Sequence, residues 1–131
     1  MVTDFLQEIK KITRLDTRFE PEAYTFVMET LHYYTQTHKV KAGQHISGQQ
    51  LAEGFRQHAI KCFGPMAKFT INSWGIQSTH DVGTIVYNMI GAGLMGKTET
   101  DSIDDFLDVY DFDAALKEDY SLDAEEEQNN D

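Results

Sequence analysis

His58 and Cys62 are the two side chains of this sequence whose types and spacing could do chemistry together. They lie four residues apart in "HAIKC", so on a helix the imidazole and the thiol share one face. Such a pair would suit a cysteine nucleophile activated by histidine, or half of a zinc site. A zinc ion would need two further ligands. The other histidines of the chain form no second close-spaced pair that could supply them: His32, His38, His45 and His80.

The helix that must carry this pair favours a structural interpretation instead. Ser47 and Gln50 fit a capping box at its start, and Gly64 ends it before Pro65. The expected inner face is apolar and includes the thiol: Leu51, Phe55, Ala59 and Cys62. We therefore predict a buried core thiol, with His58 at the margin of the core. An enzyme or metal site at His58 and Cys62 stays open as an alternative.

No other pattern in the sequence indicates catalysis or a cofactor. The carboxylates between 99 and 113 do not follow the ligand spacing of an EF-hand loop. The glycines of "GAGLMG", residues 91–96, fall at the end of a predicted helix, which is the wrong end for binding phosphate. We predict no catalytic residue, no metal and no cofactor, and we expect a non-enzymatic protein.

The remaining periodicity predicts further helices around this one. Phe5, Ile9 and Ile12 share a face of a helix from Thr3 to about Leu15. A second helix begins at Pro21 and buries Ala23, Val27, Leu31 and Tyr34. A third runs from Pro65 to Trp74, and Ser78 with Asp81 caps a fourth that opens with Thr79. The last two, separated by 75–78, predict a helix-turn-helix.

The segment after these helices has the composition of a β-hairpin. "FLDVYDF", residues 106–112, is rich in aromatic and β-branched side chains, and it could pair with "LMGKT", residues 94–98, across a tip at 99–105. The predicted fold is mainly α, a winged-helix-like domain with a helix-turn-helix and a small β-hairpin. "DAALKEDY", residues 113–120, could add a helical turn.

Net charge divides the chain into a nearly neutral body and an acidic end. Residues 98–131 hold fourteen acids and one base, whereas residues 1–97 hold eight acids and ten bases. Residues 120–131 contain too little apolar surface to offset the entropy of ordering, which predicts a disordered acidic C-terminal tail after a single domain, 1–119. A lone cysteine and the lack of a long apolar run favour a cytoplasmic protein that does not enter a membrane.

Three stretches of the chain carry a resemblance to a known family. They are "FGPMA" at 63–67, "WGI" at 74–76 and "GLMGKTETDSIDDF" at 93–106. With these the chain resembles a family of small, uncharacterised bacterial conserved hypothetical proteins with an FGPMA…WGI…GLLGKTxxDSxxDF pattern. The resemblance covers roughly residues 5–115. It implies no activity and no catalytic residue, so the functional hypotheses rest on the residues themselves.

The helix that opens with Thr79 sits where a DNA reader would place its recognition helix. No lysine or arginine occurs between Thr79 and Gly96, although phosphate contacts supply most of the affinity for DNA. The charge therefore argues against reading of the major groove by this helix. Its outward residues, His80, Thr84, Tyr87 and Asn88, are either plain surface or a protein-binding face, because tyrosine is a favoured interface anchor.

A cluster of cations on the first helix gives the alternative function. Lys10, Lys11 and Arg14 form a basic stripe, and Arg18 continues the four-residue spacing. The stripe is either solvated surface or a site for polyanions, including the protein's own acidic tail. We predict a protein-interaction or regulatory module with a protein partner, and alternatively a nucleic-acid-associated regulator that uses the stripe.

Overall fold

The computed structural model describes residues 2–41, 44–97 and 101–116, and it is mainly helical. The elements are α1 (Val2–Leu15), α2 (Pro21–Thr37), α3 (Gly48–Phe63), η1 (Gly64–Met66), α4 (Ala67–Ser73), α5 (Thr79–Gly91) and η2 (Ile103–Phe106), where η marks a 3-10 turn. Residues 112–116 are also helical. The predicted helices are thus confirmed, with α4 beginning two residues later than expected. In the part described, no helix is both long and apolar enough to cross a bilayer.

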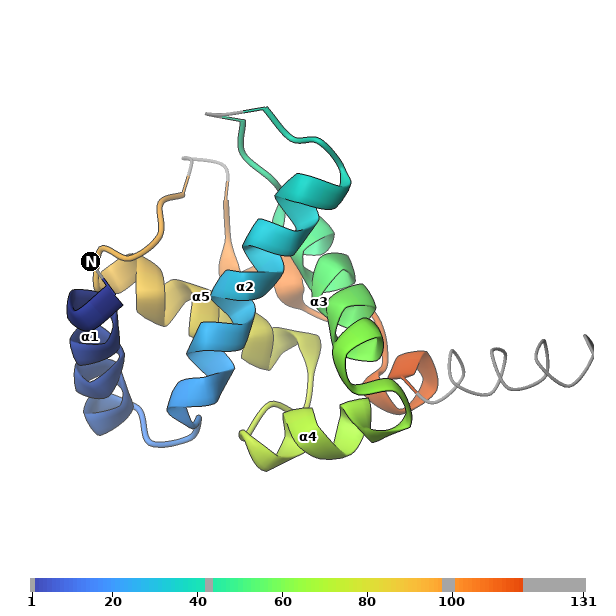
Figure 1. Cartoon of the computed structure of the whole chain (residues 1–131), viewed down its shortest axis with the longest axis horizontal. Coiled ribbons are helices and arrows are strands. Elements are labelled where there is room, and N and C mark those ends of the chain that lie inside the picture. The colour runs from blue at the N-terminus through green and yellow to red at the C-terminus, as the bar shows by residue number, and fades with distance from the viewer. Residues whose placement is uncertain (1, 42–43, 98–100, 117–131) are drawn as a thin grey trace, which may run out of the picture.

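The helices enclose one core that draws on all of the longer elements. In Figure 1, α2 and α3 lie side by side, and α5 crosses behind α2. Fully buried side chains come from α1, α2, α3, α4 and α5, respectively: Ile9, Tyr24, Phe55, Ile71 and Met89. Burial of such side chains in a shared core provides the main stabilisation, because helices of this length are marginal in isolation.

The helix starts that the sequence predicts are formed by the expected side chains. The Ser47 hydroxyl accepts from the Gln50 backbone N–H at 3.1 Å, and the Gln50 side chain accepts from the Ser47 N–H at 2.8 Å. At α5 the Ser78 hydroxyl accepts from the Asp81 N–H at 3.3 Å, but the Asp81 carboxylate takes the N–H of Gln77 instead of that of Ser78. Both first turns therefore have partners for N–H groups that the helices leave free.

The predicted β-hairpin is wrong, and with it the winged-helix fold. The described residues contain no strand, and 103–106 form η2 where the hairpin tip and second strand were expected. Ser102 and Asp105 start this turn, since Asp105 Oδ2 accepts from the Ser102 N–H at 3.2 Å and Ser102 Oγ accepts from the Asp104 N–H at 3.2 Å. Asp108 has a φ of +48°, which turns the chain where a strand would run straight.

Burial of Phe106 explains why the β-prone segment folds this way. Its ring lies between Gly48 of α3 and Gly83 of α5, where a Cβ would stand 2.9 Å and 2.7 Å from the ring, respectively. The Thr79 hydroxyl donates to the Phe106 carbonyl at 2.5 Å and accepts from the Val109 N–H at 3.3 Å. The segment thus packs against two helices as a wedge, and strand propensity gives way to tertiary packing.

Two predictions concern residues that the structure does not fully describe. The helical turn expected in 113–120 is confirmed for 113–116, because 112–116 are helical. The acidic tail, 120–131, and the last three residues of the predicted domain, 117–119, lie outside the described residues.

Candidate functional site

A cavity of about 630 Å³ opens between α2, α3 and α5. Buried Leu51, Val86 and Phe106 contribute from three elements, and we take them as its floor. Half-buried apolar side chains line the rest: Met28, Leu31, Ile46, Ile90, Leu94 and Met95. Concave sites of roughly 300–1,000 Å³ with mostly apolar walls are typical of ligand-binding sites. No pattern in the sequence predicted this site.

The end of α5 brings its own following residues back to the cavity. Gly93 has a φ of +77°, a conformation that glycine adopts without steric cost, and its N–H bonds to the Ile90 carbonyl at 3.0 Å. The Leu94 N–H then bonds to the Met89 carbonyl at 2.8 Å. This reversal is a helix-ending turn, and it places Leu94 and Met95 on the wall beside Ile90.

Polar side chains also line the cavity, and they come from α5, from the connection between α2 and α3 and from the connection between α5 and η2. His45 Nε2 lies 3.0 Å from Asp101 Oδ2, an ion pair when the imidazole is protonated. Lys97 places its ammonium 5.8 Å from the centre of the Tyr87 ring. Burial raises the pKa of Tyr87, as do the carboxylates of Asp101 and Asp105, so its phenol remains a hydrogen-bond donor at neutral pH.

The structure separates the residues predicted as a partner-binding face. Tyr87 lines the cavity, whereas the His80 side chain lies near the start of α5 and borders a smaller hollow of about 380 Å³. Thr84 is 7% exposed, and its hydroxyl donates to the His80 carbonyl at 3.2 Å. The four residues therefore do not share one open surface.

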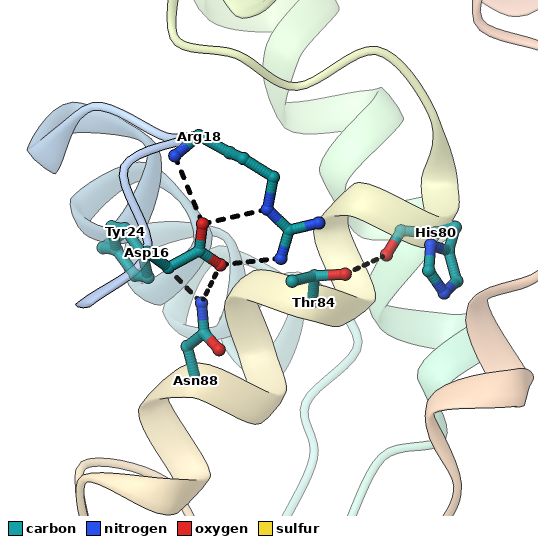
Figure 2. Close-up of polar contacts among 6 residues, drawn as sticks. All are labelled: Asp16, Arg18, Tyr24, His80, Thr84 and Asn88. Atoms are coloured by element: carbon teal, nitrogen blue, oxygen red, sulfur yellow. Dashed lines mark hydrogen bonds and ion pairs between the residues drawn. The ribbon is translucent and has the colours of Figure 1, made fainter. Parts of the chain in front are cut away.

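Asn88, the last of that set, is held within the fold (Figure 2). Its side-chain N–H group donates to Asp16 Oδ2 at 3.0 Å and to the Tyr24 hydroxyl at 3.1 Å. Arg18 donates two hydrogen bonds to the same carboxylate, from Nε to Oδ1 at 2.9 Å and from Nη2 to Oδ2 at 2.7 Å. These hydrogen bonds hold the pKa of Asp16 well below its usual range. The cluster joins α5 to the connection between α1 and α2, so Asn88 has a structural role.

The placement of His58 and Cys62 is the reverse of the prediction. Cys62 is exposed, and His58 is buried. The imidazole stacks between the rings of Phe26 and Tyr33, with centroids at 4.4 Å and 4.9 Å, and its Nδ1 lies 3.0 Å from the Thr30 hydroxyl. Helical periodicity does not account for this, because seven residues advance a helix by 700°, within 20° of two full turns, so position 62 shares the face of Phe55. Cys62 is instead the penultimate residue of α3, at the end of the helix.

The pKa shifts of His58 and Cys62 do not favour a thiolate nucleophile. Burial lowers the pKa of His58 and raises the pKa of the Cys62 thiol, to which the nearby Glu29 carboxylate also contributes. A raised pKa leaves little thiolate at neutral pH. Among the described residues, no three His, Cys, Asp or Glu side chains gather closely enough to hold a metal ion.

The basic stripe on α1 is accessible. Lys10, Lys11 and Arg14 are exposed, and Lys11 pairs with Glu8 at 3.1 Å. Arg18 does not extend the stripe, because its guanidinium is bound to Asp16.

Comparison of the chain with models of protein families, with curated proteins and with solved structures gave no match. The resemblance of "FGPMA", "WGI" and "GLMGKTETDSIDDF" to a bacterial family therefore stays a prediction. In the structure, 63–67 lie at the corner between α3 and α4 and 74–76 in the connection to α5. Of the third stretch, the described residues 94–97 line the cavity, and 103–106 form η2.

Proposed function

We propose that this protein is a non-enzymatic binding protein with a regulatory role, which takes an apolar ligand into the cavity between α2, α3 and α5. The cavity itself is the observation that carries the proposal. It offers an apolar floor and walls from several elements, with polar groups where the loops meet. A protein partner would then meet the loops around the cavity, where Tyr87 supplies a half-buried aromatic anchor.

Binding is favoured over catalysis by the state of the side chains that suggested an enzyme. The His58 imidazole is stacked inside the core, and the Cys62 thiol is exposed with a raised pKa. Of the carboxylates at the cavity, Asp101 pairs with His45 and Asp105 caps η2. Both carboxylates therefore stabilise the connections around the cavity, a role that suits a binding protein.

Reading of DNA by α4 and α5 as a helix-turn-helix is not part of the proposal. Thr84 is buried and Asn88 is committed to Asp16 and Tyr24, so neither side chain is free to contact a base. The β-wing that would add backbone contacts is replaced by η2.

A neutral fluorescent dye tests the proposal. N-phenyl-1-naphthylamine brightens in apolar sites, and we expect it to bind the wild type with one-to-one stoichiometry. Leu94→Trp fills part of the cavity and should abolish most of the signal. Leu15→Trp is the matched control, because Leu15 is 90% exposed and lies on α1. Equal dye binding by a folded Leu94→Trp protein would exclude the cavity as the site.

Polyanion binding is the second candidate function, supported by the exposure of Lys10, Lys11 and Arg14. We expect any such binding to weaken steeply with salt, because it depends on release of counterions. The test is an electrophoretic titration with random duplex DNA at low salt, using Lys10→Glu with Arg14→Glu against Lys41→Glu as an exposed control. Wild-type protein that fails to shift the DNA at low salt rules this function out.

A further inference from the structure

The polar groups at the cavity divide into acceptors that are already used and donors that are not. Asp101 is paired with His45 at 3.0 Å, and Asp105 accepts the Ser102 N–H at 3.2 Å. The Ser47 and Ser102 hydroxyls each accept from a backbone N–H at the start of a helix. The acceptors of the lining are therefore largely occupied within the protein.

The uncommitted groups are hydrogen-bond donors. Across the described residues, the Tyr87 hydroxyl, the Lys97 ammonium and the His32 ring have no hydrogen bond or ion pair. Lys97 contacts Tyr87 through the ring face, so these two donors occupy the same corner of the cavity. A ligand with a hydrogen-bond acceptor would satisfy these donors. An anionic acceptor would bind best, since charge-assisted hydrogen bonds are stronger than those between neutral groups.

We propose that the ligand is an aliphatic carboxylate, with its chain on the apolar wall of Leu31, Ile90 and Met95 and its carboxylate bound by Tyr87 and Lys97. This inference rests on the proposed function and specifies the ligand for the same cavity. The chain contributes most of the binding free energy by burial, and the carboxylate fixes its orientation.

A cationic amphiphile is the natural competitor, and the geometry disfavours it. The face of the Tyr87 ring, which could attract an organic cation, already carries the Lys97 ammonium at 5.8 Å. Asp101 and Asp105 act electrostatically on Tyr87 and oppose an anion there. His45 offsets the charge of Asp101 when its imidazole is protonated, with Nε2 3.0 Å from Asp101 Oδ2.

Competition against the neutral dye tests the head group directly. We compare decanoate, decanol and decyltrimethylammonium below their aggregation limits, each with the full-length protein. Decanoate should displace the dye at about tenfold lower concentration than decanol, because a charge-assisted hydrogen bond to a partly buried donor is worth roughly one power of ten. Decyltrimethylammonium should be the weakest of the three.

Two pairs of variants separate the donors from general effects of substitution. Lys97→Ala and Tyr87→Phe should each weaken decanoate by about five- to tenfold and weaken decanol much less, because a neutral hydroxyl makes no charge-assisted hydrogen bond. Lys61→Ala and Tyr33→Phe are the matched controls, because Lys61 lies over the Tyr33 ring at 5.2 Å and neither residue lines the cavity. These controls should leave the affinity for both compounds unchanged.

The outcomes distinguish this inference from the proposed function. Equal displacement by decanoate and decanol, or a preference for the ammonium compound, overturns the carboxylate and leaves an apolar ligand site. Loss of decanol binding in Lys97→Ala also overturns it, because that result would show a disturbed cavity wall. Failure of the dye itself to bind the wild type overturns both.

Discussion

Asp16 accepts hydrogen bonds from the backbone N–H, Nε and Nη2 of Arg18 and from the side chain of Asn88. Its carboxylate therefore links the connection after α1 to α5, although it is separated from Asn88 by 72 residues. At the scale of the residue, this cluster shows how a polar side chain that looked available for a partner is used within the fold.

We expect Asp16→Asn to lower the free energy of unfolding at pH 7 by about 1–3 kcal/mol, since hydrogen bonds to a charged group are lost. A lowered pKa in the folded state stabilises the fold above the ordinary value of 3.8, and this stabilisation is lost as pH falls below it. The difference between wild type and variant in urea unfolding should therefore shrink from pH 7 to pH 3. Asp113→Asn is the control, because that side chain is 71% exposed in its pair with Lys68. An equally large effect of the control would contradict the prediction.

Cys62 should react with a thiol reagent in the native protein, because it is exposed. Its raised pKa leaves the thiolate scarce at neutral pH, so the rate should climb steadily between pH 7 and pH 9. The measurement is release of thionitrobenzoate from Ellman's reagent with and without denaturant. Labelling that requires denaturant would contradict the exposure of Cys62. Fast labelling at pH 6 would contradict its raised pKa and support the enzyme alternative.

At the scale of the element, η2 is held by features on two helices that are remote in sequence. Gly48 begins α3 and Gly83 lies within α5, and together they leave room for the Phe106 ring. Thr79 fixes the backbone on either side of the turn. Glycine inside a helix costs up to about 1 kcal/mol relative to alanine. The close packing of Phe106 against α5 explains why position 83 is nevertheless a glycine.

Gly83→Ala and Gly91→Ala make a matched pair in one helix. A Cβ at Gly83 would lie 2.7 Å from the Phe106 ring, so we expect a loss of about 1–3 kcal/mol through overpacking. A Cβ at Gly91 meets nothing within 4 Å, and Gly91→Ala should be neutral or stabilise by up to about 1 kcal/mol. Thermal unfolding of both variants decides the matter. Equal effects would show that Phe106 does not pack against α5.

At the scale of the whole molecule, charge is unevenly distributed along the chain. Residues 1–97 are nearly neutral, and residues 98–131 carry fourteen acids against one base. The basic stripe of α1 is exposed at the opposite end of the sequence. Attraction between such exposed groups is weak and screened, worth at most about 1 kcal/mol.

Removal of residues 120–131, which contain five acids and no base, should hardly change the melting temperature. It should strengthen binding to heparin at low salt, because these acids compete for Lys10, Lys11 and Arg14. The gain should vanish near 1 M salt, where the screening length is about 3 Å. Heparin affinity chromatography of both proteins at several salt concentrations is the measurement. Identical elution at low salt would show that the acidic end does not act on the stripe.

The sequence by itself determined the helices and where they begin, because caps and periodicity act within a few residues. Ser47 with Gln50, Ser78 and Pro21 each start the helix they predict, and the apolar spacing identified Leu51, Phe55 and Ala59 as buried. Position 62 was predicted to be buried and is exposed, because it shares the face of Phe55 but lies at the end of α3, and periodicity does not show how far neighbouring elements cover that face. Burial of His58 depends on stacking with the rings of Phe26 and Tyr33, which the spacing within α3 does not reveal.

Tertiary structure alone decided the segment after α5 and the candidate site. "FLDVYDF" satisfies the local preferences of a strand, but the space beside Gly48 and Gly83 admits Phe106, and burial against two helices outweighs those preferences. The cavity likewise joins side chains from α2, α3, α5 and the loops after them, from Met28 to Phe106. No short-range pattern encodes such a juxtaposition, because it depends on how the helices cross.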